Sequence, residues 1–306
     1  MSKTAVRSLA VTVIASAIQF TGLMPSAEGI VRRDDVDDQQ YIDFGAQFPS
    51  VGMFSSNGSI RGSGVLISSG GTGQSRWVLT AAHLSTPNEF TIDDSLYTVS
   101  EFIRHPDWGG DGGGLTTGLE NDIALARLDA AVSGVTPSAW HDNDGDLLTG
   151  LELVSVGFGR SGTGLTGGSG SAGTKRAAEN TLETLGAASP LTPPETAFEY
   201  LFQNPDNDFV GAGARPLEGI GAVFDSGGPV LADFGDGFVV VGIHSYVRNN
   251  DGSNNLGTYG DDMGSTRVPL FDDWIMATVP EPKTWSLLSG LAVLATVVLW
   301  RRRRAH

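Results

Sequence analysis

The stretch Phe224-Asp225-Ser226-Gly227-Gly228-Pro229 sets a serine between an acidic residue and two glycines, with a proline close behind. Aspartate, serine, glycine and proline in this order are typical of a tight turn rather than of a strand interior. Such a turn exposes the Ser226 hydroxyl and leaves neighbouring backbone N–H groups free to converge on one point. A nucleophile for acyl transfer needs an accessible hydroxyl beside donors for an oxyanion. In isolation, the same residues would indicate only an ordinary polar turn.

Two upstream segments change that interpretation. Thr80-Ala81-Ala82-His83 follows the apolar run Trp77-Val78-Leu79, and Asn121-Asp122-Ile123-Ala124-Leu125 comes later in the chain. With the Ser226 stretch, they resemble the three signature segments of the trypsin-like (chymotrypsin-fold) serine proteases, in that family's order of His, Asp and Ser. The resemblance spans Ile30 to about Val279. It implies an all-β fold of two antiparallel β-barrels packed face to face, with a catalytic cleft between them and a short C-terminal helix.

The resemblance assigns catalytic roles residue by residue. Ser226 would attack the scissile carbonyl, and His83 would take its proton and later give it to the leaving amine. Asp122 would hold the imidazole in the productive tautomer and stabilise its cation. The backbone N–H groups of Phe224 and Ser226 would form the oxyanion hole. The family strongly prefers glycine where Phe224 stands, a residue that adopts unusual backbone angles without steric cost.

The resemblance also places the substrate pocket. Its base falls on Ile220, which cannot supply the carboxylate that cleavage after Arg or Lys needs. On the wall strand, Ser245 would support Asp122 and Tyr246 would pair with the substrate backbone. His244 would either face the pocket and accept an acidic side chain, as in glutamate-specific relatives, or pack behind the wall. We expect a neutral, medium-sized residue before the cleaved bond.

In the resembling family, a new N-terminal Ile-Val folds inward and its α-amino group pairs with the acid just before the nucleophile. Here these residues are Ile30-Val31 and Asp225. Ala27-Glu28-Gly29 places small residues where a signal peptidase looks for them. The sequence therefore predicts that export itself creates the Ile30 terminus, with no separate zymogen step.

Composition and patterning agree with a β protein. Glycine is abundant at 42 residues, and only 18% of the 306 residues are charged. Spacing over Val268 to Val279 predicts a helix with Leu270 and Ile275 turned inward. Apolar, β-forming runs predict strands at Gly62–Ile67, Arg76–Thr80, Tyr97–Arg104, Ile123–Leu128, Leu151–Gly159 and Phe238–Ile243.

Both ends of the chain are typical of processing segments. Lys3 and Arg7 precede an apolar run and a small-residue site, so residues 1–29 are expected to be a secretory signal peptide. At the other end, Pro280-Glu281-Pro282 leads into an apolar segment between Trp285 and Trp300, with an arginine cluster behind it.

The tail, residues 280–306, resembles a PEP-CTERM sorting signal. That resemblance implies an exosortase-type processing enzyme of a Gram-negative bacterium as a partner, and contact with the membrane through the tail before processing. A permanent single-pass anchor is the alternative. In either case the protease-like domain, residues 30–279, is expected outside the inner membrane, either secreted or on the cell surface or extracellular matrix.

Charge and composition exclude several other classes. Residues 30–279 contain 12 Lys and Arg against 33 Asp and Glu, a net charge of −21 that repels nucleic acid. The chain has no cysteine, hence no disulfide or thiolate metal site, and no H-E-x-x-H for zinc. Asp142-Asn143-Asp144-Gly145-Asp146 resembles a calcium loop but lacks the later bidentate Glu, so an exposed acidic turn is expected. No metal or cofactor is expected.

Two rival functions remain to be weighed. An α/β-hydrolase needs G-x-S-x-G and the chain order Ser, acid, His. Position 224 is Phe, and His244 and His306 alone follow Ser226, without alternating strands and helices around them. The second rival is a catalytically inactive protease homologue that acts as an extracellular binding protein. Phe224 is the feature that favours it, while the filled His83, Asp122 and Ser226 positions favour an endopeptidase acting on protein or peptide substrates.

Overall fold

The computed structural model describes residues 29–68, 71, 73–110, 119–186, 195–206, 213–250, 252 and 255–279. The signal peptide and sorting tail expected from the sequence lie outside the described residues, apart from Gly29. In the described ranges, no helix is both long and apolar enough to cross a membrane.

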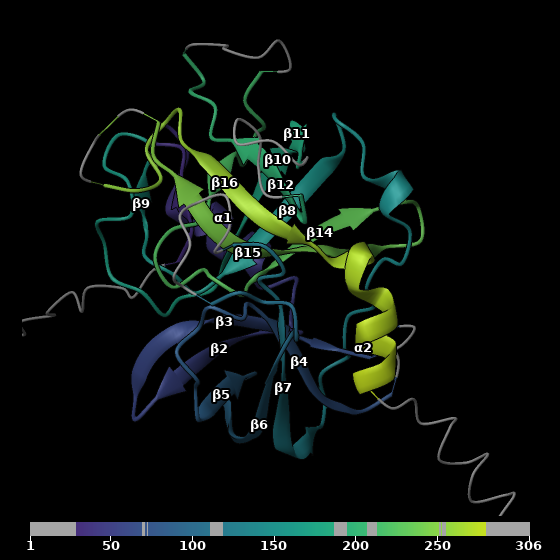
Figure 1. Ribbon diagram of the computed structural model, residues 1–306. Coiled ribbons are helices and arrows are strands. Elements are labelled where there is room, and N and C mark those ends of the chain that lie inside the picture. Colours follow the sequence, from purple (N-terminus) through teal and green to yellow (C-terminus); the bar gives the residue numbers. More distant parts are fainter. Residues whose placement is uncertain are drawn as a thin grey trace, which may run out of the picture.

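The N-terminal half forms a closed six-stranded antiparallel barrel (Figure 1), with the strand order β2-β3-β4-β7-β6-β5. Its strands are β2 (Val51–Ser56), β3 (Ser59–Ile67), β4 (Ser75–Thr80), β5 (Glu89–Ile92), β6 (Ser95–Arg104) and β7 (Ala124–Val132). Two tight hairpins set the register. Asn57-Gly58 joins β2 to β3 and Asp93-Asp94 joins β5 to β6, all four residues with positive φ, as type I′ turns require.

The C-terminal half is a seven-stranded sheet in the order β10-β8-β14-β15-β16-β12-β11. Its strands are β8 (Glu152–Gly157), β10 (Arg176–Thr181), β11 (Thr184–Leu185), β12 (Ala197–Leu201), β14 (Pro229–Asp233), β15 (Phe238–Arg248) and β16 (Asp262–Arg267). The predicted all-β fold class is confirmed, but this second sheet is open where the sequence predicted a closed barrel. Closure fails because β11 is only two residues long and the backbone of Glu179 in β10 bonds to Leu217 instead, with an N···O distance of 2.8 Å.

A small third sheet joins the start of the domain to the segment that precedes Ser226. Strand β1 (Val31–Arg32) lies between β13 (Gly219–Ile220) and β9 (Gly162–Thr163). The helix α1 (Asp38–Gly45) follows, with Asp37 as its N-cap, and packs against β10. These contacts place Ile30 close to the segment that precedes Ser226.

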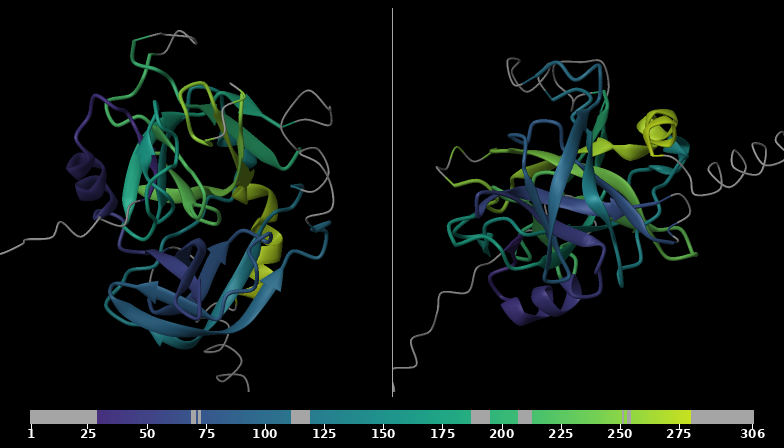
Figure 2. Two further views of the ribbon diagram at one scale, coloured as in Figure 1. Left: turned by 90° about the vertical axis from the view of Figure 1, so that its left-hand side faces the viewer. Right: turned by 90° about the horizontal axis from the view of Figure 1, so that it is seen from below.

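The predicted C-terminal helix is present as a 3₁₀ turn, η3 (Val268–Phe271), followed by α2 (Asp272–Thr278). It lies along the barrel of the N-terminal half (Figure 2), where Phe271 and Ile275 join the same apolar cluster as the barrel strands. Leu270 was predicted to face inward but is 46% exposed, because it lies in the tighter 3₁₀ turn rather than in the α-helix. The cluster also includes Val156 and Leu231 of the second half, so one core joins both halves.

Candidate active site

His83 and Asp122 are brought together by paired strand ends. Thr80, the last residue of β4, pairs with Ala124, the first residue of β7. His83 follows β4 and Asp122 precedes β7, so the two side chains meet at the same edge of the barrel. His83 Nδ1 lies 2.7 Å from Asp122 Oδ2, and the His83 backbone N–H donates to Asp122 Oδ1 at 2.9 Å.

Asp122 is fully buried and well supplied with donors. Besides the two bonds from His83, its Oδ2 accepts from Ser245 Oγ at 2.5 Å. Thr266 Oγ1 donates to the backbone carbonyl of Asp122 at 3.0 Å. A carboxylate held this way fixes the imidazole with Nε2 directed away from it, and would stabilise an imidazolium. The Ser245 contact was expected from the sequence, whereas the Thr266 contact was not.

Ser226 lies in a pair of consecutive β-turns. Asp225 N–H donates to the Ala222 carbonyl at 2.9 Å, and Gly228 N–H donates to the Asp225 carbonyl at 2.8 Å. The third residues of these turns, Phe224 and Gly227, have φ of 77° and 82°, the positive φ of a type II turn. Phe224 therefore takes the conformation for which the family uses glycine, at a cost of about 1–2 kcal/mol.

The turn leaves two donors unoccupied. Carbonyl groups of the turn are anchored by Ser63, whose Oγ donates to Phe224 O at 3.1 Å and whose N–H donates to Ser226 O at 2.9 Å. In contrast, the N–H groups of Phe224 and Ser226 donate to no acceptor within the described residues. Two free donors beside the Ser226 hydroxyl are what an oxyanion needs.

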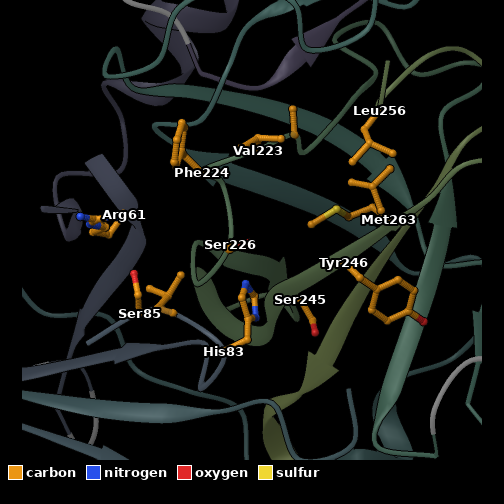
Figure 3. A pocket seen from close by; sticks show the side chains of 13 residues that line it. Arg61, His83, Ser85, Val223, Phe224, Ser226, Ser245, Tyr246, Leu256 and Met263 are labelled. Carbon is orange, nitrogen blue, oxygen red and sulfur yellow. The ribbon is translucent and has the colours of Figure 1, made fainter. Parts of the chain in front are cut away.

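His83 and Ser226 line one cleft of about 510 Å³. Figure 3 shows His83 and Ser226 among the residues that line this cleft. The remaining lining residues are Arg61, Leu84, Ser85, Ala222, Val223, Phe224, Ser245, Tyr246, Val247, Leu256 and Met263. None of these described residues carries a carboxylate, so the cleft offers no anionic partner for a basic side chain.

Asp225 points away from the cleft into a buried cradle of N–H groups. Its carboxylate accepts from Gly159 N at 2.7 Å, from Ala222 N at 2.8 Å and from Ile30 N at 3.3 Å. Burial raises the pKa of Asp225 to about 7, although these three bonds act in the opposite direction. Only glycine fits at positions 157 and 159, because a Cβ atom there would lie 2.0 Å and 2.4 Å from the Asp225 carboxylate oxygens.

A family model for trypsin matches residues 45–275, which is most of the chain. The chain belongs to the trypsin family. A second model, the PEP-CTERM protein-sorting motif, matches residues 278–304. This motif indicates export and surface sorting in a Gram-negative bacterium, with processing by an exosortase.

Individual relatives agree with the family assignment. The vitamin K-dependent protein C of Oryctolagus cuniculus is 29% identical over 223 residues, which cover 67% of this chain and 45% of the relative. The chain thus spans about half the length of the curated relative it matches. Among solved structures, neuropsin, a serine protease expressed in the limbic system of mouse brain, superposes with a TM-score of 0.58. The two are 19% identical, with 81% of this chain and 99% of neuropsin covered, so this likeness shows the trypsin fold alone.

Two candidate pocket residues do not line the cleft: Ile220, which the resemblance placed at the pocket base, and His244, for which packing behind the wall was the alternative. Ile220 is fully buried because it belongs to β13 and pairs with Val31 of β1. His244 is also fully buried, with Nδ1 3.3 Å from the Asp225 carbonyl and Nε2 3.3 Å from Tyr200 Oη. Burial lowers the pKa of His244 to about 4, so it is neutral at pH 7 and offers substrate no charge.

Other residues shape the pocket instead. Met263, Val247 and Leu256 line the cleft together with Tyr246. The Met263 thioether lies against Gly221, where a Cβ atom would be 3.0 Å from its Cε. Sequence reasoning missed these three residues because they come from β15, β16 and the loop between them, outside any motif.

Proposed function

We propose that the chain is an exported serine endopeptidase that uses His83, Asp122 and Ser226 and forms an acyl-enzyme intermediate. The observation that carries this proposal is the 2.7 Å contact between His83 Nδ1 and the buried Asp122, with Ser226 in the same cleft. Because Asp122 occupies Nδ1, the Nε2 atom is the one left to exchange a proton with substrate and nucleophile.

The reaction follows from these positions. Ser226 Oγ attacks the carbonyl of the cleaved bond while His83 Nε2 takes the hydroxyl proton. The N–H groups of Phe224 and Ser226 bind the oxyanion of the tetrahedral intermediate. His83 then protonates the amine, which leaves, and a water molecule activated by the same imidazole hydrolyses the acyl-enzyme.

The alternative of an inactive homologue rested on Phe224. Its φ of 77° keeps the turn in the conformation that a glycine would allow, and its N–H group donates to no described acceptor. This supports catalysis rather than binding alone. The proposal is tested by a peptide-library cleavage profile of the secreted domain with the Ser226→Ala variant as control. Cleavage that is equal in both proteins would reject the proposal.

The cleft supports cleavage after a neutral, medium-sized residue, because Met263 and Val247 line it with apolar side chains and none of its described lining residues carries a carboxylate. Met263→Ala should deepen the pocket and raise the kcat/KM ratio of Phe over Val before the cleaved bond by about 10-fold or more, since a few methylene groups are worth 1–3 kcal/mol in such pockets. The ratio is measured on paired peptides that differ only at that residue. An unchanged ratio, or efficient cleavage by the wild type after Arg or Lys, would contradict this assignment.

The sorting motif leads to a prediction about the tail. In a host with an exosortase, mature protein should lose the segment after Pro282, whereas in a host without that enzyme the protein should stay membrane-bound. Mass spectrometry of the C-terminal peptide and membrane fractionation measure both outcomes. Full-length protein recovered from the native host's exterior with its tail intact would count against processing.

A further inference from the structure

Ser226 divides the cleft into two chemically different ends. On one side lie Tyr246, Leu256 and Met263, and on the other lie Arg61 and Phe224 (Figure 3). The first end is apolar, whereas the second carries a guanidinium group.

The two ends receive different parts of a substrate. If the side chain before the cleaved bond occupies the apolar end, the chain after that bond must continue past Ser226 to the opposite end. This path also takes the leaving amine past His83, which must protonate it. Arg61 and Phe224 therefore face the residues that follow the cleaved bond.

A second guanidinium lies at the same end. The Arg160 Cζ atom is 5.9 Å from the centre of the Phe224 ring, close enough for a cation–π contact. The Arg160 backbone N–H donates to Val223 O at 2.8 Å, which fixes residue 160 beside the cleft wall. Arg61 from β3 thus lines the cleft together with Phe224, and Arg160 from the other half of the molecule lies near the Phe224 ring.

Neither guanidinium has a carboxylate partner among the described residues, and both side chains are exposed. This contrasts with six other arginines of the described ranges, each within 4.0 Å of an Asp or Glu: Arg32, Arg33, Arg176, Arg215, Arg248 and Arg267. Among the described residues, Arg76, Arg104 and Arg127 also have no carboxylate within 4.0 Å, but none of them lines the cleft and each is less exposed than Arg61 and Arg160. Two unpaired guanidinium groups at one end of the cleft are open to a carboxylate from substrate.

We propose that Arg61 and Arg160 select substrates with Asp or Glu within the first two residues after the cleaved bond, an inference that rests on the proposed endopeptidase function. A guanidinium binds a carboxylate through paired N–H donors, and an amide of the same shape binds more weakly. Phe224 lines the cleft, and its ring lies within cation–π distance of Arg160.

The test compares two peptides that differ only in Glu or Gln at the second residue after the cleaved bond, each with Val before that bond. At low ionic strength the wild type should favour the Glu peptide by about tenfold in kcat/KM. The Arg61→Gln/Arg160→Gln double variant should bring that ratio to about one. Effects common to both peptides cancel in the ratio. Arg127→Gln removes the same charge from β7, away from the cleft lining, and should keep the preference.

Binding of the same peptides to the Ser226→Ala protein separates this inference from the proposed function. In one outcome, the wild type cleaves neither peptide while the Ser226→Ala protein binds the Glu peptide about tenfold tighter than the Gln peptide. If Arg61→Gln/Arg160→Gln then removes this difference in binding, the catalytic proposal fails and the acidic preference stands. Equal kcat/KM values and equal Kd values for the two peptides would overturn the preference. The inference would also be overturned if the preference for the Glu peptide survived in the double variant, or if Arg127→Gln removed it as completely as the double variant does.

Discussion

Replacing Ser226 by Ala should lower kcat for peptide hydrolysis roughly a million-fold, and His83→Ala should be as severe. Both side chains act in one step, because the hydroxyl is a weak nucleophile until the imidazole takes its proton. The Ser226→Ala/His83→Ala double variant should therefore lose little more than either single variant. Steady-state hydrolysis of a peptide amide by the four proteins measures this.

Asp122→Asn provides a graded comparison and should lower kcat about 10⁴-fold, because the amide favours the wrong imidazole tautomer. Circular dichroism melting of each variant is the control for folding, and Ser226→Ala should melt close to the wild type because its side chain is half-buried in a surface turn. Near-native turnover by Ser226→Ala, or fully additive losses in the double variant, would contradict the assigned roles.

A protein that begins at Ile30 should be about 100-fold more active at pH 8 than one that begins at Gly29. In the structure the Ile30 nitrogen is a neutral amide that donates to Asp225, a buried carboxylate with a pKa of about 7. A free α-amino group at that position would supply a cation, and an unpaired buried charge costs about 3–5 kcal/mol. We propose that signal peptidase cleaves after Gly29 and so creates the pair directly. N-terminal sequencing of active secreted protein decides this, since a start at Glu28 or well past Val31 removes the mechanism.

The pH dependence of stability should differ between these two proteins. With Gly29 retained, the unfolded chain releases the Asp225 proton near pH 4 and the folded chain near pH 7, so stability falls as the pH rises between these values, by about 4 kcal/mol. With a free Ile30 terminus, the pair raises the pKa of the amine. Its stabilisation is therefore complete below the amine's unfolded pKa of about 8 and is lost at more alkaline pH. Equal melting temperatures of the two proteins at pH 8 would contradict the pairing, and Asp225→Asn should abolish the difference.

Local sequence was sufficient for residues whose neighbours in the chain determine their geometry. His83, Asp122 and Ser226 could be predicted to act together because the segments around them resemble the three signature segments of the trypsin-like proteases, and the residues on either side of Ser226 are typical of a turn. The fold class followed from the same segments. The Ser245 contact with Asp122 was also implied by this resemblance.

Features that depend on packing between distant segments could not be predicted. Ile220 is buried because β1 pairs with it, and His244 is buried with its ring nitrogens near Tyr200 Oη and the Asp225 carbonyl. Whether Phe224 could adopt a positive φ depends on the contacts that hold the turn, not on the residue type. The extent of the second sheet likewise depends on a backbone hydrogen bond at its edge, from the Glu179 N–H to the Leu217 carbonyl.

The central claim is that Ser226 is an activated nucleophile, and covalent labelling tests it most directly. A fluorophosphonate reacts with a serine only when a base and oxyanion donors act on the same hydroxyl. Incubation of the secreted domain with the probe, followed by peptide mass spectrometry, should give one adduct on Ser226, and the Ser226→Ala and His83→Ala proteins should give none. A folded wild-type protein that stays unlabelled, or an adduct that persists in Ser226→Ala, would contradict the account.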